Sequence, residues 1–299
     1  MLTRRLLPSL VKRLSVLSNA DEGSLTYYTG VELGPVSHLR RCALLVGPEF
    51  HQKLPEEWGV EVIQTHSAQE VFYRLSEEFK EDFLESERLQ PSKSAWVHPE
   101  AKLGAGVKLG PGSVIGNCVL EDGVTVGPQA LVYSKSHIKE GTSIGASTVV
   151  GAPGMMWVWG GAGKKEKIFL EQLGGVEIGS NCRIGSNITI VRGNANEVTK
   201  IGNDVCIAHG SMVGHGCRID DLGHLANKVA LGGSVVLGKA CFLGSGATVS
   251  PGNVLTDGVV LGAGATLVKN AVEPGVYVGC PAVRKEATKR DMRGVPKWR

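Results

Sequence analysis

Aliphatic residues recur at every sixth position over a long stretch of the chain, residues 201–271. No helix repeats with a period of six, and a strand with one buried face would alternate every second residue instead. A strict six-residue period is typical of a parallel β-helix, in which each hexapeptide forms one short strand and a turn. The aliphatic side chains then point inward, and three hexapeptides close one triangular coil. The repeated positions are Ile201, Ile207, Val213, Ile219, Leu225, Leu231, Leu237, Leu243, Val249, Leu255, Leu261 and Leu267.

The residue four places after most of these positions is small or of modest size. This fits a narrow interior, in which two side chains from each face share the space. The residues in this second phase are Val205, Ser211, Cys217, Val229, Val235, Cys241, Ala247, Val259 and Ala265.

The same pattern extends towards the N-terminus as far as Val97, with one residue lost near Leu120. It breaks over residues 153–175 and slips again around 194–199. We therefore expect a mainly β chain, with a parallel β-helix of eight or nine coils over residues 93–272. Residues 153–175 should form a loop that projects from a coil corner, and long loops in compact domains are often functional.

Residues 21–92 have a mixed pattern that predicts a small α/β domain. Ser67, with Glu70 three residues later, has the spacing of a capping box at the start of a helix. A segment rich in Pro, Ser and Lys at 90–94 has the composition of a linker. The predicted strands are 41–46 and 60–63, and the predicted helices are 48–54 and 67–87.

The two ends of the chain differ from the rest. Residues 1–20 are basic, contain serines and regularly spaced leucines, and carry no acidic residue. This composition predicts a mitochondrial transit peptide, and hence a mitochondrial location. The alternative is an ordinary N-terminal helix, although Pro8 interrupts that pattern. The tail, residues 273–299, is basic and is predicted to contain a short helix.

Composition excludes several other classes of protein. Glycine numbers 41 and aromatic residues make up only 5%, which suits a coiled solenoid with an aliphatic core. The chain has no apolar run long enough to span a bilayer, so no transmembrane segment is expected. Four of the cations behind the net charge of +3 lie in residues 1–20, and no basic patch interleaved with aromatic residues indicates nucleic-acid binding. Seven cysteines without a CxxC pair indicate buried thiols in a reducing compartment.

Three histidines, His209, His215 and His224, lie within sixteen residues. A coil is eighteen residues long, so His215 should stack against Gly233 on the next coil, whereas the other two belong to other faces or corners. No metal ion within one subunit can therefore be bound by all three, although ligands from two subunits remain an alternative. An imidazole can act as a general base, and a glycine amide can stabilise an oxyanion. The other interpretation of His215 is an ordinary surface histidine.

Three motifs resemble the UDP-3-O-acylglucosamine N-acyltransferases of lipid A synthesis. They are GVEIGSNCRIGSNITIVRGN at 175–194, IGNDVCIAHGSMVGHGCRI at 201–219 and VEPGVYVGCPA at 272–282. The resemblance implies a left-handed parallel β-helix, a homotrimer and an N-terminal uridine-binding domain over 21–92. It further implies transfer of a 3-hydroxyacyl chain from acyl carrier protein, whose phosphopantetheine carries the acyl group, to the 2-amine of a UDP-3-O-acylglucosamine, with no other cofactor and no metal.

The resemblance also implies roles for single residues. The catalytic base of the family falls on His215, and its oxyanion glycine falls on Gly233, which agrees with the stacking expected from the coil length. The segment GAPGMMW (151–157) resembles a family loop near the substrate. The basic tail would dock an acidic acyl carrier protein. The candidate substrate-binding residues are Tyr27, Tyr28, Met155, Met156, Trp157 and His209.

The chain departs from the family pattern at two positions. A second functional histidine falls on Gly252, and an aspartate of the family falls on Val191. Three alternative functions therefore stay open: an acetyl-CoA-dependent sugar acetyltransferase, a metal-dependent carbonic anhydrase of the γ type, and a non-catalytic β-helix scaffold.

Overall fold

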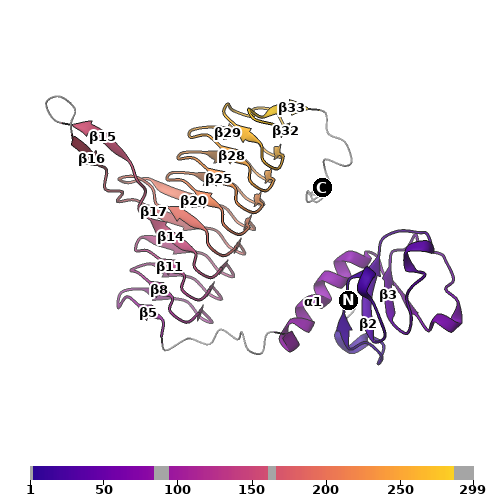
Figure 1. Cartoon of the computed structure of the whole chain (residues 1–299). Coiled ribbons are helices and arrows are strands. Elements are labelled where there is room, and N and C mark those ends of the chain that lie inside the picture. Colours follow the sequence, from indigo (N-terminus) through magenta and orange to yellow (C-terminus); the bar gives the residue numbers. More distant parts are fainter. Residues whose placement is uncertain (1–2, 84–93, 161–165, 286–299) are drawn as a thin grey trace. The chain divides into compact units, whose positions relative to one another are not determined.

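The computed structural model describes residues 3–83, 94–160 and 166–285 (Figure 1). The chain divides into two compact units, Met1–Arg88 and Leu89–Arg299. The first unit is built on a small sheet with one long helix, and the second is a solenoid of short strands. No helix among the described residues combines the length and the apolar character needed to cross a membrane.

The N-terminal unit contains a four-stranded, all-parallel sheet in the order β1-β2-β3-β4. One helix, α1 (Ala68–Phe83), packs against the sheet, which confirms the predicted α/β class. The strands are β1 (Arg13–Leu14), β2 (Ser24–Tyr28), β3 (Ala43–Val46) and β4 (Glu61–Gln64). Short 3-10 helices lie at η1 (Arg4–Leu6), η2 (Leu17–Asn19), η3 (Gly34–Val36) and η4 (Glu56–Trp58).

The central strand β3 is buried on both faces because each face carries its own apolar cluster. Ala43 and Leu45 lie in the cluster that includes residues of α1, whereas Leu44 and Val46 lie in the cluster on the opposite face with Phe50. This alternation is the period of two expected for a strand between two layers.

The segment before residue 21 is part of this unit. Arg13 and Leu14 pair in parallel with Ser24 and Leu25, so β1 is an edge strand of the sheet. Leu7, Val11 and Leu14 also pack against the apolar cluster beneath α1. A leader removed at residue 20 would therefore take one strand and three apolar side chains with it.

One predicted helix of this unit is absent. Residues 48–54 form no helix, and the nearest helical turn is η4 (Glu56–Trp58). Two prolines, Pro48 and Pro55, bracket the segment, and a proline disfavours helical backbone at the residue before it.

The capping box at the start of α1 is only half formed. The backbone N–H of Glu70 donates to Ser67 Oγ at 3.4 Å, whereas the Glu70 carboxylate accepts from Arg74.

The second unit is a left-handed parallel β-helix with three flat sides, as predicted. Figure 1 shows its coils stacked one above another. Sheet I, in chain order, consists of β5 (Trp96–Val97), β8 (Val114–Ile115), β11 (Leu131–Val132), β14 (Val149–Ala152), β19 (Thr189–Val191), β22 (Met212–Val213), β25 (Ala230–Leu231), β28 (Thr248–Val249) and β31 (Thr266–Leu267).

The other two sides are sheets II and III. Sheet II consists of β6 (Lys102–Leu103), β9 (Val119–Leu120), β12 (Ser136–Ile138), β17 (Gly175–Ile178), β20 (Val198–Ile201), β23 (Arg218–Ile219), β26 (Val236–Leu237) and β29 (Val254–Leu255). Sheet III consists of β7 (Lys108–Leu109), β10 (Thr125–Val126), β13 (Ser143–Ile144), β18 (Arg183–Ile184), β21 (Cys206–Ile207), β24 (His224–Leu225), β27 (Phe242–Leu243), β30 (Val260–Leu261), β32 (Val276–Val278) and β33 (Val283–Lys285).

The predicted repeat and its interruptions are confirmed by the pairing of the strands. Val213 pairs with Leu231, eighteen residues later, whereas Leu103 pairs with Leu120, seventeen residues later. All twelve aliphatic positions from Ile201 to Leu267 are at most 3% exposed, and they form one continuous core with the small residues of the second phase. Six residues make one third of an eighteen-residue coil, so each sixth residue occupies the same inward position on the next side of the solenoid.

Two segments leave the regular coil. The predicted projecting loop contains a hairpin of two antiparallel strands, β15 (Trp157–Gly160) and β16 (Glu166–Phe169). At the C-terminal end, β33 (Val283–Lys285) folds back antiparallel to β32, so the predicted tail helix does not begin there. The rest of that prediction, residues 286–299, lies outside the described residues.

Candidate functional site

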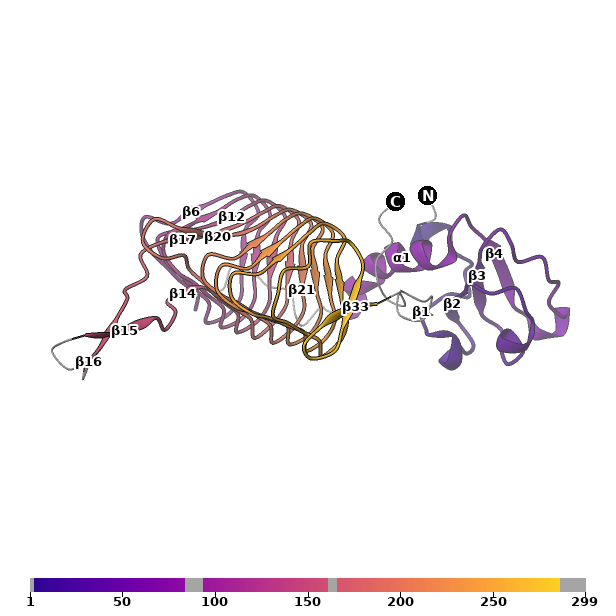
Figure 2. The ribbon, with the colours of Figure 1, turned by 90° about the horizontal axis from the view of Figure 1, so that it is seen from above.

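One edge of the solenoid collects most of the candidate residues. At this edge, which we name the I–II corner, the chain passes from a strand of sheet I to the next strand of sheet II. The hairpin leaves the solenoid there, between β14 and β17, as Figure 2 shows from above. The next coils place the 192–197 loop, then His215, then Gly233 at the same corner.

His215 and Gly233 stack as the coil length predicts. A Cβ atom added to Gly233 would lie 2.3 Å from His215 Nε2, so the imidazole rests on the bare backbone of this glycine. Any larger residue at position 233 would displace the ring. The Gly233 amide N–H makes no hydrogen bond with the described residues, whereas the N–H of Ser234 donates to the His215 carbonyl at 2.7 Å. A ring nitrogen and an unused peptide donor therefore lie side by side.

The other ring nitrogen of His215 faces the 192–197 loop. His215 Nδ1 lies 3.3 Å from Asn194 Nδ2 and 3.8 Å from Glu197 Oε2. The imidazole is 23% exposed and the Glu197 side chain 37%, so solvent or a substrate can reach both. Gly216, which has a φ of +63°, lets the carboxylate approach, because a Cβ there would lie 2.2 Å from Glu197 Oε1.

The base of the hairpin contacts the same loop. Gln172 is only 4% exposed, and its Oε1 accepts a hydrogen bond from the backbone N–H of Gly154. Its Nε2 donates to Asn194 Oδ1 at 3.0 Å. The backbone N–H groups of Gly174 and Gly175 donate to the carbonyls of Gly193 and Glu197. The hairpin is thus connected to His215 through Gln172 and Asn194.

The sequence assigned no role to Gln172, Asn194 or Glu197. The only signal was the slip of the repeat around 194–199, which is where the 192–197 loop adds residues to a coil. A six-residue period cannot say which side chains meet across such an irregular turn.

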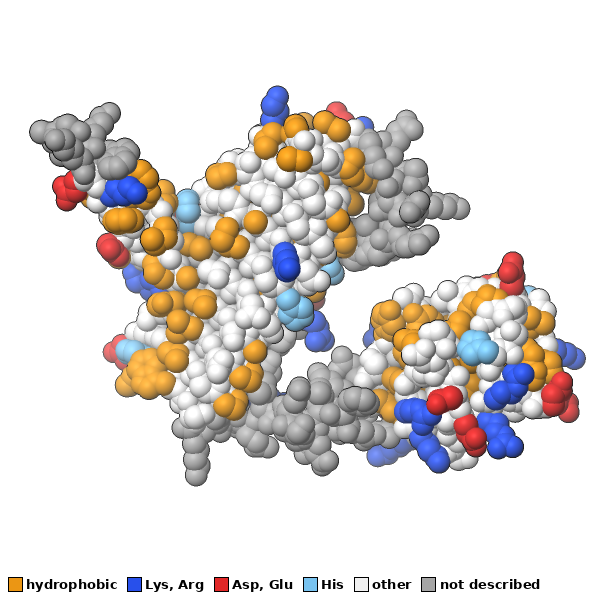
Figure 3. All heavy atoms as spheres, in the orientation of Figure 1, with side chains coloured by type: hydrophobic (Ala, Val, Ile, Leu, Met, Phe, Trp, Pro, Cys, Tyr) orange, Lys and Arg blue, Asp and Glu red, His pale blue; other side chains and the backbone are white. Residues whose placement is uncertain are grey.

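The hairpin carries the predicted acyl-binding residues on its surface. Met155 is 82% exposed, Met156 36% and Trp157 40%. The ammonium of Lys167 lies 4.5 Å from the centre of the Trp157 ring. Figure 3 shows hydrophobic side chains over the hairpin and along the adjacent side of the solenoid. The hairpin leaves the solenoid at the I–II corner, where His215 lies on a later coil.

The other two histidines lie elsewhere on the solenoid, as expected. His209 sits at the corner between sheets III and I, where its Nδ1 accepts a hydrogen bond from the backbone N–H of Ser186 at 2.9 Å. At other turns of the solenoid, Asp122 and Asn203 likewise accept a hydrogen bond from a backbone N–H through a side-chain oxygen. His224 lies on the outer face of sheet III, stacked on Phe242, and burial lowers its pKa. Within the described residues, no group of three or more His, Cys, Asp or Glu could hold a metal ion.

Tyr27 and Tyr28 lie in the N-terminal unit, on opposite faces of its sheet. The Tyr27 ring lies 5.0 Å from that of Phe72 on α1, and the Tyr28 ring lies edge-on to Phe50 at 6.2 Å. Both rings are half-buried, so each has a packing role as well as a surface that a ligand could reach.

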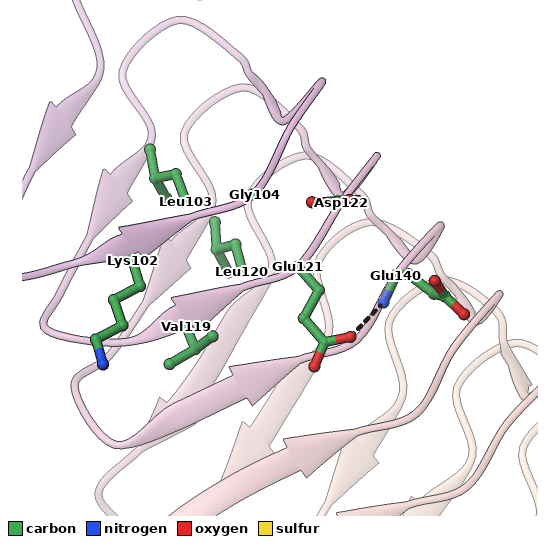
Figure 4. Close-up of a pocket in the computed structure, with 8 residues that line it drawn as sticks. All are labelled: Lys102, Leu103, Gly104, Val119, Leu120, Glu121, Asp122 and Glu140. Carbon is green, nitrogen blue, oxygen red and sulfur yellow. Dashed lines mark hydrogen bonds between the residues drawn. The ribbon is translucent and has the colours of Figure 1, made fainter.

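Two hollows lie away from these candidate residues. One, of about 420 Å³, is on sheet II beside the first coils, and Figure 4 shows its lining. There Glu121 accepts a hydrogen bond from the backbone N–H of Glu140 and contacts His137. The other, of about 410 Å³, lies in the N-terminal unit between β4 and the start of α1.

Comparison with known proteins supports the predicted resemblance, although no family model matches the chain. A UDP-3-O-acylglucosamine N-acyltransferase of Coxiella burnetii is 31% identical over 159 residues, which are 45% of this chain and 46% of that protein. The enzyme of the same name from Pseudomonas paraeruginosa is 28% identical over 236 residues, which are 68% of this chain and 64% of that protein. The chain therefore spans less than half the length of the first relatives it matches.

Two solved structures share the fold. LpxA from Acinetobacter baumannii superposes with a TM-score of 0.60 at 21% identity, covering 68% of this chain and 76% of that one. LpxA from Bacteroides fragilis, a UDP-N-acetylglucosamine acyltransferase, gives 0.58 at 25% identity, covering 65% and 73%. The solenoid thus defines the class as a left-handed parallel β-helix protein with the fold of these acyltransferases. Within that class, the chain is similar to the UDP-3-O-acylglucosamine N-acyltransferases, and the resemblance predicted from its motifs is confirmed.

Proposed function

We propose that the protein is an N-acyltransferase that moves a 3-hydroxyacyl chain from acyl carrier protein to the 2-amine of a UDP-3-O-acylglucosamine. One observation carries this proposal: the imidazole of His215 rests on Gly233, whose amide N–H is unused. A proton acceptor and an oxyanion donor that lie side by side are the two groups that acyl transfer needs.

The geometry supports a two-stage reaction. The sugar amine attacks the thioester carbonyl carbon while His215 Nε2 takes a proton from the amine nitrogen. The carbonyl oxygen becomes an oxyanion, which the Gly233 N–H stabilises. Collapse of this tetrahedral intermediate breaks the carbon–sulfur bond, and the proton on His215 passes to the departing thiolate. The products are the amide and the free phosphopantetheine thiol, and the imidazole returns to its neutral state.

The substrates would use the surfaces around this pair. The acyl chain would lie against Met155, Met156 and Trp157, whose exposed apolar area would be covered on binding. Tyr27 or Tyr28 would contact the uracil of the nucleotide. His209 remains a candidate contact from its own corner. The acyl carrier protein would dock on the basic tail, most of which lies outside the described residues.

Assembly and location complete the proposal. We infer a homotrimer, because the outward residues of sheet I include exposed Trp96, Val114 and Met212 and no charged residue. We further infer a mitochondrial location from the basic, acid-free segment 1–20.

A reconstituted transfer assay tests the chemistry. The purified protein receives 3-hydroxyacyl-acyl carrier protein and UDP-3-O-acylglucosamine, and acetyl-CoA serves as the competing donor. His215→Ala should reduce turnover by about 100- to 10,000-fold, the usual loss for a missing general base. Unchanged turnover in that variant would refute the assigned mechanism. Transfer from acetyl-CoA alone would instead favour a sugar acetyltransferase.

Accumulated substrate in cells tests the choice of acceptor. Cells that lack the protein should accumulate the mono-acylated UDP-glucosamine, and a plasmid copy should remove it. An unchanged lipid profile would count against this acceptor while leaving acyl transfer to another amine open.

A further inference from the structure

The hydrogen bonds behind His215 determine which ring nitrogen carries the proton. A backbone N–H can only donate, so the N–H of Gly154 requires Gln172 to present its carbonyl oxygen. The Gln172 amide group must then point the other way, and it donates to Asn194 Oδ1 at 3.0 Å. One fixed donor at the base of the hairpin thus sets the orientation of two amide side chains in succession.

The last member of this chain is the imidazole. With its oxygen engaged by Gln172, Asn194 presents its NH₂ group to His215 Nδ1 at 3.3 Å. Nδ1 must accept that hydrogen bond, so a neutral imidazole in this arrangement carries its proton on Nε2. Nε2 is the nitrogen that faces Gly233, and a protonated Nε2 cannot take a proton from an amine.

The carboxylate of Glu197 lies near His215 Nδ1 and would favour the opposite tautomer. Glu197 Oε2 lies 3.8 Å from His215 Nδ1 and accepts a hydrogen bond from the backbone N–H of Asn194 at 3.0 Å. A carboxylate can only accept, so closer approach of Glu197 would require the proton on Nδ1 and leave Nε2 free. Asn194 and Glu197 belong to the same short loop, so a shift of that loop that brings Glu197 closer to Nδ1 would exchange one partner for the other.

We propose that Gln172 and Asn194 are positioning residues through which the base of the hairpin holds His215 in the tautomer with its proton on Nε2. When the 192–197 loop shifts, Glu197 selects the tautomer with the proton on Nδ1, which leaves Nε2 free to act as a base. The change moves no net charge: Nε2 releases a proton to water and Nδ1 takes one from water. Its consequence for catalysis rests on the proposed acyl transfer. Binding of an acyl chain along the hairpin would then trigger this change, since Met155, which would contact the chain, directly follows Gly154, which holds Gln172.

The tautomer itself can be measured without any activity. Solid-state NMR of the full-length protein labelled with ¹⁵N-histidine reports which ring nitrogen is protonated, and the difference from His215→Gln assigns the signal. The unliganded wild type should show a proton on Nε2. Asn194→Asp keeps the contact with Gln172 but replaces the donor with an acceptor, so the proton should move to Nδ1.

Two further variants complete the test. Asn203→Asp makes the same chemical change at another corner, where Asn203 Oδ1 caps the N–H of Ser180, and should leave the His215 signal as in the wild type. Gln172→Ala frees Asn194 to rotate and should give a mixture of tautomers. A wild-type proton on Nδ1, or an unchanged signal in Asn194→Asp or in Gln172→Ala, would overturn the proposal.

Turnover then links the tautomer to the reaction. The kcat of Asn194→Asp should exceed that of the wild type, because Nε2 is then free before the substrate binds, whereas Glu197→Gln should lose on the order of 100-fold in kcat with little change in KM. A tautomer change without a rise in kcat would show that Asn194 does not hold the imidazole back. If neither the wild type nor any variant transfers an acyl group, the proposed function fails. The NMR result still decides which nitrogen of His215 carries the proton.

Discussion

At the scale of single residues, the site depends on side chains that are absent as much as on those present. The Nε2 end of the His215 ring can approach the next coil closely only because Gly233 has no Cβ, and Glu197 can approach only because Gly216 has none. The stacking of His215 on Gly233 could be predicted from the sequence, because it follows from the eighteen-residue coil. Asn194 and Glu197 could not, because the loop that holds them breaks that count.

Gly233→Ala should abolish most activity without unfolding the protein. The new methyl group would lie 2.3 Å from the present position of His215 Nε2, so the ring must move away from the oxyanion site. The expected loss of kcat is about 100- to 1,000-fold, the scale of a lost oxyanion donor. Gly34→Ala is the control, since nothing lies within 4 Å of that site. Full activity in Gly233→Ala would contradict the stacked geometry.

His224 should make the stability of the solenoid depend on pH. Burial lowers the pKa of this imidazole below its ordinary value of 6.5. The unfolded chain therefore binds more protons than the folded one between that lowered pKa and about 6.5, and stability falls as the pH falls through this window. Denaturant unfolding from pH 7.5 to 5 measures the slope. His224→Gln should flatten it, and an equal slope in this variant would contradict the assignment.

At the scale of elements, regular packing could be predicted and irregular turns could not. The strands of the solenoid follow from aliphatic residues that must fill a narrow interior at a fixed interval. Helix α1 follows from its capping serine and apolar face. One helix predicted from local propensity, 48–54, was not found, because prolines bracket it. Of the predicted tail helix, only Val283–Lys285 lies among the described residues, and there the chain pairs with β32 instead. Tertiary pairing decided the conformation of that last segment.

The hairpin should serve acyl binding and contribute little to the stability of the solenoid. Met155→Ser removes an apolar side chain that is 82% exposed, so the unfolding midpoint should stay within the usual error of measurement. If the acyl chain covers this residue, the KM for a long-chain donor should rise several-fold, since a buried CH₂ contributes about 0.8 kcal/mol. The KM for a short-chain donor should not change. Equal effects on both donors would exclude a contact with the acyl chain.

At the scale of the whole molecule, the three sides of the solenoid differ in what they expose. The outward positions of sheet II include Lys102, Glu177, Lys200 and Arg218, whereas those of sheet I carry no charge. Burial of charged groups in an interface is costly unless they are paired. Sheet I is therefore the side best suited to contact a second copy of the chain, and its edge with sheet II carries His215.

Charge placed on sheet I should therefore weaken the proposed trimer. Val114→Lys combined with Met212→Lys puts two ammonium groups on outward positions that are 37% and 46% exposed in the single chain. Sedimentation velocity should show dissociation to monomers at concentrations at which the wild type remains trimeric. Val254→Lys makes the same change on sheet II, at a residue 39% exposed, and should leave the trimer intact. If the sheet II variant dissociates instead, subunits meet through that side, and His215 lies next to a different neighbour.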